Sequence, residues 1–119
     1  MAGLSPNGEG FEARFVFPDT FTGFKGHFPG NPILPGICTV QTVLVSAGAW
    51  KKTPLKLEEI VTAKFFFPIL PGDELLLSCR PGERKNGNSL LKATASCNGR
   101  EVAKITLQVA YVDDGETDG

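Results

Sequence analysis

The chain has 119 residues, which is enough for one domain with a buried core and too little for two. Its 12 basic and 13 acidic residues leave a net charge of -1 and are scattered along the chain, so nucleic-acid binding is not expected. With 14 glycines, 9 prolines and 41% hydrophobic residues, the composition indicates a turn-rich globular domain and excludes a disordered chain.

Cysteine and histidine usage indicates neither a disulfide framework nor a metal site. The three cysteines, Cys38, Cys79 and Cys97, are an odd number without a CxxC pair. Residues 1–10 lack the basic and then apolar pattern of a signal peptide, so a reducing cytoplasm is the expected compartment. Because zinc sites draw on close pairs of ligands and the chain has one histidine, no metal is expected.

A single domain is expected from residue 11 to residue 112. The ends, 1–10 and 113–119, are rich in glycine or acidic residues and lack apolar periodicity, so we expect both to be flexible. From Phe11 to Phe17 an apolar side chain recurs at every second residue, which predicts a half-buried strand that stops at Pro18.

One long uncharged stretch, from Phe28 to Trp50, predicts a buried helix. Its second half, Gly36 to Trp50, follows Pro35 and is compatible with a helix of about four turns. Because no charged residue interrupts it, we expect this helix to be buried on all sides. Prolines and polar residues break the stretch, so a membrane span, which needs about 20 predominantly apolar residues, is not expected.

Four further strands are predicted after the helix, at Leu57–Phe67, Glu74–Arg80, Ser89–Cys97 and Glu101–Val112. Asn-Gly pairs separate the last three, as in β-hairpins. In the last hairpin the apolar residues of both strands fall on odd positions. This parity favours a three-residue loop with a bulge over a two-residue turn, because a slip of one residue would place a lysine on the apolar face.

One strand, one hydrophobic helix and four antiparallel strands predict an α+β domain in which the sheet curls around the helix, the hotdog fold. Such a sheet leaves an edge strand and a flank uncovered, and pairing two protomers into a continuous sheet covers both. We therefore expect a homodimer or a higher assembly of dimers.

The only histidine, His27, lies in a loop that leads into the helix and reads GHFPGNPILPG from Gly26 to Gly36. Its prolines and glycines favour a rigid loop. The N–H groups of Gly36 and Ile37 stand at the helix N-terminus, where free donors and the helix dipole stabilise negative charge, such as that on a thioester carbonyl. A lone histidine is more often structural, but here a base and an oxyanion site converge on one pocket.

This loop and the helix after it resemble the signature of the β-hydroxyacyl-acyl carrier protein dehydratases of fatty acid synthesis, which are hotdog enzymes. Two later runs, KFFFP from Lys64 to Pro68 and LPGDEL from Leu70 to Leu75, resemble that family's strand and turn after the helix. The resemblance implies a syn-type removal of water from a (3R)-3-hydroxyacyl thioester of acyl carrier protein or coenzyme A. The trans-2-enoyl product forms without a cofactor.

The resemblance also implies roles for single residues. His27 matches the catalytic histidine that takes the proton next to the thioester carbonyl, and Gly36 matches the residue whose N–H polarises that carbonyl. The carbonyl around Ile33 matches the group that orients the imidazole. The residues expected to contact the substrate are Phe28, Gly30, Ile33, Gly36 and Ile37.

Gln41 marks a departure from the family pattern. The family has Glu or Asp at this helix position, reaching the pocket from the opposite protomer to the histidine, whereas an amide cannot donate a titratable proton to the departing hydroxyl. A general acid typically contributes about 100- to 10,000-fold to the rate. No spacing places another carboxylate, among Asp19, Glu58 and Glu59, beside the histidine.

Three functions remain open on these residues. The first is a dehydratase in which Gln41 holds the hydroxyl or a water, alone or with a second hotdog subunit that supplies the acid opposite His27. The second is a noncatalytic subunit that binds an acyl thioester or acyl carrier protein. The third is a hotdog thioesterase in which His27 activates water.

Two groups of side chains have competing interpretations. The aromatic run either lines an acyl tunnel or belongs to the core or a dimer contact, and it comprises Phe65, Phe66 and Phe67. The basic residues either meet an acidic carrier protein or are scattered surface charges, and they comprise Lys51, Lys52, Arg80, Arg84 and Lys85.

Overall fold

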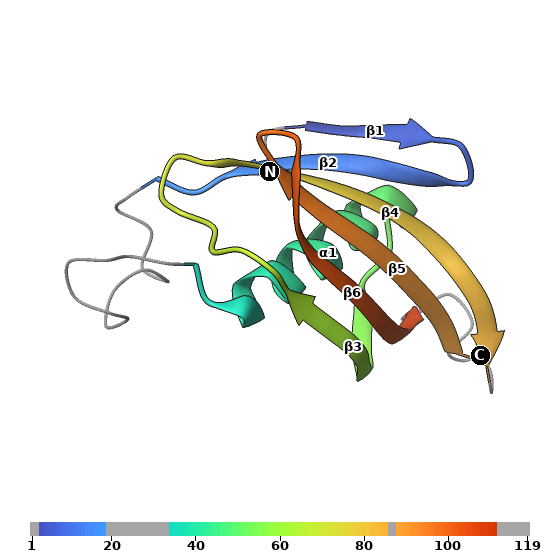
Figure 1. Cartoon of the computed structure of the whole chain (residues 1–119). Coiled ribbons are helices and arrows are strands. Elements are labelled where there is room, and N and C mark those ends of the chain that lie inside the picture. Colours follow the sequence, from blue (N-terminus) through green and yellow to red (C-terminus); the bar gives the residue numbers. More distant parts are fainter. Residues whose placement is uncertain (1–2, 19–33, 86–87, 112–119) are drawn as a thin grey trace.

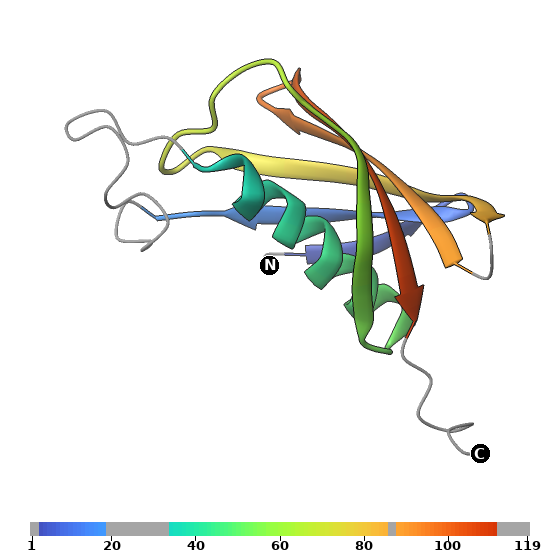
Figure 2. The ribbon, with the colours of Figure 1, turned by 90° about the horizontal axis from the view of Figure 1, so that it is seen from below.

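The computed structural model describes residues 3–18, 34–85 and 88–111. Within these ranges six antiparallel strands form one sheet in the order β1-β2-β4-β5-β6-β3, and the sheet curls around helix α1 (Figure 1, Figure 2). The elements are β1 Gly3–Asn7, β2 Gly10–Val16, α1 Gly36–Lys51, β3 Leu55–Phe65, β4 Glu74–Lys85, β5 Asn88–Cys97 and β6 Arg100–Tyr111. This is the hotdog arrangement that the sequence predicts.

The core lies between α1 and the concave face of the sheet. On α1, Val40, Val43 and Ala47 recur at helical spacing and are buried. They belong to the same apolar cluster as inward-facing strand residues such as Leu77 and Leu107, which are fully buried. No helix in the described ranges has the length and apolar character needed to cross a membrane.

The prediction that the helix is buried on all sides is wrong. Ile37, Gln41 and Val45, which follow one another at i+4 spacing, face away from the sheet and are exposed. The exposed fraction is 55% for Ile37 and 58% for Val45. The reason is that the sheet covers one side of α1, through β2, β3 and β4, and leaves the other side open. This uncharged row of three residues is called the helix stripe below.

The N-terminal residues also differ from expectation. Residues 1–10 were expected to be flexible, but Gly3–Asn7 form strand β1, which pairs with β2 from Gly3↔Arg14 to Asn7↔Gly10. Gly8, with φ of 61°, allows the tight turn between the two strands. Because β1 is an edge strand whose side chains are almost all exposed, it lacks the apolar periodicity of a core strand. The other expected flexible end, 113–119, lies outside the described residues.

The hairpin between β5 and β6 has the predicted register with a different turn. Odd positions face odd positions as predicted, with Ala95 opposite Ala103. The loop is a two-residue turn, however, in which Asn98 and Gly99 have φ of 53° and 78°. A bulge inside the ladder, where Val102 is the extra residue on β6, keeps the parity that the apolar faces require.

Strand β3 forms the other edge of the sheet. It pairs with β6 along one side, and the pairing register shifts at two places, between Leu57 and Glu59 and between Ile60 and Thr62. Three of its apolar residues, Ile60, Val61 and Phe65, are 42–47% exposed. An edge strand with an open ladder and exposed apolar side chains favours pairing with another chain. The edge that the sequence predicts is therefore present, and it lies beside the uncovered flank of α1 (Figure 2).

Candidate functional site

The start of α1 supplies the donors expected of an oxyanion site. Pro35 precedes the helix in an extended conformation, and no side chain caps the helix. Cys38 N–H donates to the Pro35 carbonyl at 2.9 Å, whereas within the described residues nothing accepts a hydrogen bond from the N–H groups of Gly36 and Ile37. These two donors at the positive end of the helix dipole are able to stabilise a negatively charged carbonyl oxygen.

The structure describes part of the predicted site. Gln41 follows Ile37 by one helical turn, and its side chain leans toward the helix start, so it lies on the same face as the Ile37 donor. The predicted residues outside the described part of the chain are His27, Phe28, Gly30 and Ile33. The predicted oxyanion donors and Gln41 thus belong to the first two turns of one helix, while the position of the histidine stays a prediction.

The residues on either side of segment 19–33 are both tied to the connection between β3 and β4. Before the segment, the Phe17 carbonyl accepts a hydrogen bond from Gly72 N–H at 2.8 Å. After it, Leu34 N–H donates to the Ile69 carbonyl at 2.8 Å, and both side chains are buried. Phe17, which precedes segment 19–33, and Leu34, which follows it, are therefore both joined to the β3–β4 connection, although they are remote from it in the sequence.

This connection is itself held in place by a β-turn. Asp73 N–H donates to the Leu70 carbonyl at 3.1 Å, and the Asp73 carboxylate accepts from Leu70 N–H at 3.0 Å. Pro71 and Gly72, with φ of 85° at Gly72, are the central residues that a type II turn requires. Asp73 is a positioning residue that the sequence analysis missed, although the Pro-Gly-Asp pattern is a signal for it.

Gly36 is needed at the helix start because an aromatic ring packs against it. A Cβ atom at this position would lie 2.9 Å from Cζ of Phe65, which is closer than normal contact. The Phe65 ring therefore covers the Cα of the residue whose N–H is the predicted oxyanion donor. Phe65 is still 47% exposed, so it belongs to the wall of the site and not to the core.

Adding a methyl group at this contact is expected to lower activity. In Gly36→Ala either the Phe65 ring or the helix start must move, and a displacement of about 1 Å in a site can cost about 100-fold. For the acyl thioester substrates that the resemblance implies, we expect kcat/KM to fall by about ten- to 100-fold, and Phe65→Leu in the same chain to recover most of it. Steady-state kinetics of both single variants and the double variant measure this, and unchanged kcat/KM in Gly36→Ala would contradict it.

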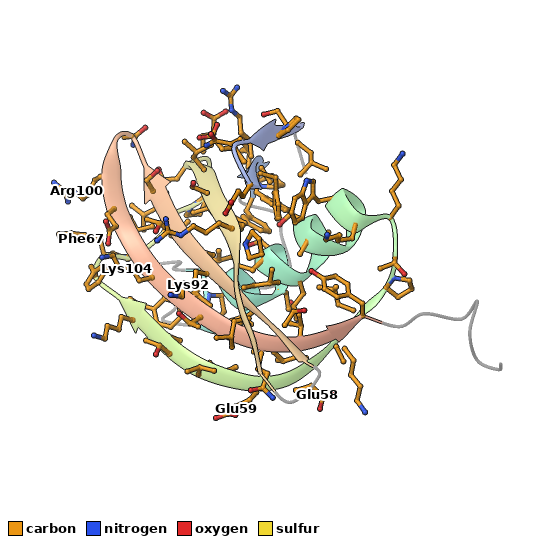
Figure 3. All side chains as sticks on the ribbon, turned by 90° about the vertical axis from the view of Figure 1, so that its right-hand side faces the viewer. Glu58, Glu59, Phe67, Lys92, Arg100 and Lys104 are labelled. Carbon is orange, nitrogen blue, oxygen red and sulfur yellow. The ribbon has the colours of Figure 1, made fainter. Side chains whose placement is uncertain are left out.

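No described carboxylate replaces the acid that Gln41 lacks. The first turn of α1 contains no acidic residue. Glu58 and Glu59 are exposed on β3 and point away from α1 (Figure 3). Asp19 lies outside the described residues. Within the described part of this protomer, the position of the general acid is therefore empty.

The three cysteines do not offer an alternative nucleophile. All three are free thiols. Burial raises the pKa of Cys79 to about 12, and burial together with the charge of Asp73 raises the pKa of Cys97 to about 11. Burial also raises the pKa of Cys38. A raised pKa favours the protonated thiol at neutral pH, which disfavours covalent catalysis through a thiolate.

The other two residues of the aromatic run, Phe66 and Phe67, lie in the connection between β3 and β4. The Arg100 guanidinium lies 4.4 Å from the centre of the Phe67 ring (Figure 3). Both belong to a cavity of about 430 Å³ between the β3–β4 connection and the β5–β6 turn. Phe66 N–H donates to the carbonyl of Val102, the bulge residue of β6, at 2.7 Å. Phe66 and Phe67 are about half exposed, so neither is a core residue.

Comparison with known sequences identifies related dehydratases. The profile of the ApeI-like family, described as ApeI dehydratase, matches residues 5–105. The 3-hydroxyacyl-acyl-carrier-protein dehydratase FabZ of Haemophilus influenzae is 33% identical over 73% of this chain. The FabZ of a Hydrogenobaculum species is 32% identical over the same share of this chain. The matches span 64% and 65% of the lengths of these two relatives.

Comparison with solved structures confirms the fold. A chain of the dehydratase heterocomplex ApeI:P from Xenorhabdus doucetiae has a TM-score of 0.72 at 23% identity, over 88% of this chain and 90% of that chain. The fluoroacetyl-CoA thioesterase FlK has a TM-score of 0.72 at 11% identity, over 91% of this chain and 88% of that chain. At these identities the likeness extends to the fold alone.

Proposed function

Because this chain belongs to the ApeI-like dehydratase family, we propose that it acts on (3R)-3-hydroxyacyl thioesters, carried by acyl carrier protein or coenzyme A, and removes water to give the trans-2-enoyl thioester. The observation that carries the proposal is the junction at the start of α1. There two N–H donors, which have no acceptor among the described residues, stand beside the β3–β4 connection that binds Phe17 and Leu34. No cofactor takes part, and the free thiols suit a reducing cytoplasm.

The proposed reaction begins at the thioester carbonyl. Gly36 N–H, supported by Ile37 N–H, donates to the carbonyl oxygen and so acidifies the neighbouring carbon. His27, oriented by the carbonyl around Ile33, takes the proton from that carbon. The electrons form the double bond as the hydroxyl group leaves carbon 3. Phe28 and Gly30 complete the contacts to the substrate.

Departure of the hydroxyl requires a proton, and Gln41 does not supply a titratable one. Its amide is able to hold the hydroxyl or a water by hydrogen bonds. We propose that a second hotdog subunit completes the site and assists the departure of the hydroxyl. It would be placed on the helix stripe and the β3 edge, both of which carry exposed apolar residues. A homodimer presents Gln41 from both chains, whereas a heteromer supplies a carboxylate. The structural relative ApeI:P is a dehydratase heterocomplex, which supports the second arrangement.

Gln41 also favours one alternative. A chain that keeps the oxyanion donors but lacks the acid is suited to binding an acyl thioester without turning it over, as a noncatalytic subunit of such a complex. A hotdog thioesterase with His27 activating water is the third candidate, and the fold that this chain shares with FlK is compatible with it.

Product analysis distinguishes these functions. Purified protein is incubated with (3R)-3-hydroxyacyl thioesters of coenzyme A and of acyl carrier protein, with the (3S) compounds as controls, and the products are identified by mass spectrometry. The proposal predicts the trans-2-enoyl thioester from the (3R) substrates alone. Release of the free acid would establish a thioesterase and overturn the proposal. If the chain alone binds the thioester without product, the assay is repeated with a second hotdog subunit that carries the helix carboxylate; binding without product there as well would establish the noncatalytic subunit and overturn the proposal.

A further inference from the structure

The outer face of the sheet carries a cluster of basic residues that the proposed reaction does not use. Arg80 on β4, Lys92 on β5 and Lys104 on β6 are exposed and come from three adjacent strands. Lys92 and Lys104 lie near each other (Figure 3). Buried neighbours of each, such as Ala93 and Ile105, point to the concave face, so the three basic side chains stand on the face opposite α1.

The register of the strands places like charges directly opposite one another. Arg80 is the cross-strand partner of Lys92, and Lys64 is the cross-strand partner of Lys104. Like charges in this arrangement destabilise a sheet. Among the described residues only Glu101 forms an ion pair with this group, with its carboxylate 3.6 Å from Lys104 Nζ. Two neighbouring pairs of like-charged side chains oppose folding, and this indicates a surface that binds an anion.

Hydroxyl groups complete the donor set between the cations. A groove of about 330 Å³ is lined by Ser78, Arg80, Lys92, Thr94, Lys104 and Thr106. The cross-strand register gives two neighbouring rows, one of Arg80, Lys92 and Thr106 and one of Ser78, Thr94 and Lys104, so each strand contributes one basic and one hydroxyl side chain. Glu12 on β2 is the cross-strand partner of Ser78, and its carboxylate accepts a hydrogen bond from Asn7 at 3.0 Å.

We propose that this groove binds a phosphate ester of a small molecule. Neighbouring strands are about 4.8 Å apart, so the long side chains of Arg80, Lys92 and Lys104 are able to converge on one tetrahedral anion. An arginine fork and hydroxyl donors match phosphate oxygens. The volume is in the range of small-ligand sites and is too small to admit a helix about 10 Å wide. The groove has no exposed large apolar side chain for insertion into a lipid surface.

Calorimetric titration with inorganic pyrophosphate and with adenosine 5′-diphosphate tests this site and separates an inorganic from an organic phosphate. The unmodified protein is expected to bind at least one of the two. Lys92→Gln and Thr94→Val are expected to weaken that binding by about tenfold or more. Lys56→Gln is the matched control, because Lys56 is exposed on β3, loses the same charge and lies outside the groove. Its dissociation constant is expected to change by less than about twofold.

A second readout follows from the repulsion between Arg80 and Lys92. In buffer without phosphate, Lys92→Gln is expected to raise the melting temperature, because it removes one like-charge pair. Pyrophosphate is expected to raise the melting temperature of the unmodified protein more than that of Lys92→Gln. The proposal is overturned by absence of binding, by an equal loss in Lys56→Gln, or by binding of a poly-glutamate peptide in place of the phosphates. None of these outcomes depends on turnover of acyl thioesters.

Discussion

Replacing Gln41 by Glu is expected to raise the rate of dehydration by at least about tenfold, since a positioned general acid contributes about 100- to 10,000-fold. The side chain stands on α1 one turn after Ile37, on the exposed helix stripe, so a carboxyl group of nearly the same size fits without displacing a core residue. In the proposed reaction this carboxyl protonates the departing hydroxyl, which the amide does not.

The gain is measured as kcat/KM for a (3R)-3-hydroxyacyl thioester. Gln41→Met is the control, because it keeps the length of the side chain and provides no acid. It is expected to show no gain. A rate for Gln41→Glu equal to that of the unmodified protein would mean that residue 41 does not reach the leaving group, and would contradict the proposed role of this position.

The second large effect concerns assembly. Val45, 58% exposed at the C-terminal end of the helix stripe, is expected to be buried when a second subunit covers α1. Val45→Lys would place an unpaired charge in that contact, and uncompensated charges of this kind cost about 3–5 kcal/mol. We expect the dissociation constant of the dimer to rise by about 100-fold or more. Analytical ultracentrifugation over a range of protein concentrations measures the change.

Val16→Lys is the matched control for this experiment. Val16 lies on β2, is 48% exposed and undergoes the same chemical change away from the helix stripe and the β3 edge. Its dissociation constant is expected to stay within about twofold of the unmodified value. If both variants dissociate equally, the helix stripe is not the contact surface. If the unmodified protein sediments as a monomer, the homodimer is excluded and only assembly with a different hotdog subunit remains.

Local sequence signals predict most of the framework. Pro35 fixes where α1 begins, and the period of two between Phe11 and Phe17 predicts β2 almost to the residue. The helix extends one residue beyond the prediction, to Lys51. The parity of the apolar residues in β5 and β6 predicts their register, because one face of each strand must be buried. These features depend on neighbours in the sequence, which is why a single chain reveals them.

Features that depend on remote residues were not predictable in the same way. Strand β1 has no apolar period, since its pairing with β2 uses the backbone alone. The open side of α1 follows from the size of the sheet and not from the composition of the helix. Likewise, the hydrogen bonds of Phe17 and Leu34 to the β3–β4 connection join segments that are far apart in the sequence. The repulsive pairing of Arg80 with Lys92 requires the strand register.

The part of the candidate site at the start of α1 could be predicted from the sequence. Gly36 and Ile37 are helix-start residues whatever surrounds them, so the prediction that their N–H groups serve as donors follows from Pro35 and the helix that comes next. The contact of Phe65 with Gly36 was not accessible, because the aromatic run by itself is compatible with a tunnel, a core or a dimer contact. The position of His27 lies outside the described residues, and its role remains a proposal.

Hydration of a trans-2-enoyl thioester, the reverse reaction, tests most directly whether His27 and residue 41 belong to one site. The rate is measured for Gln41→Glu and for the double variant His27→Ala with Gln41→Glu. Arg14→Gln in the Gln41→Glu chain is the control, because Arg14 is exposed on β2, away from the helix stripe and the β3 edge. The proposal predicts turnover by Gln41→Glu and its control, and loss of turnover in the double variant. Equal rates in all three would remove His27 from the mechanism and contradict a dehydratase built on this loop.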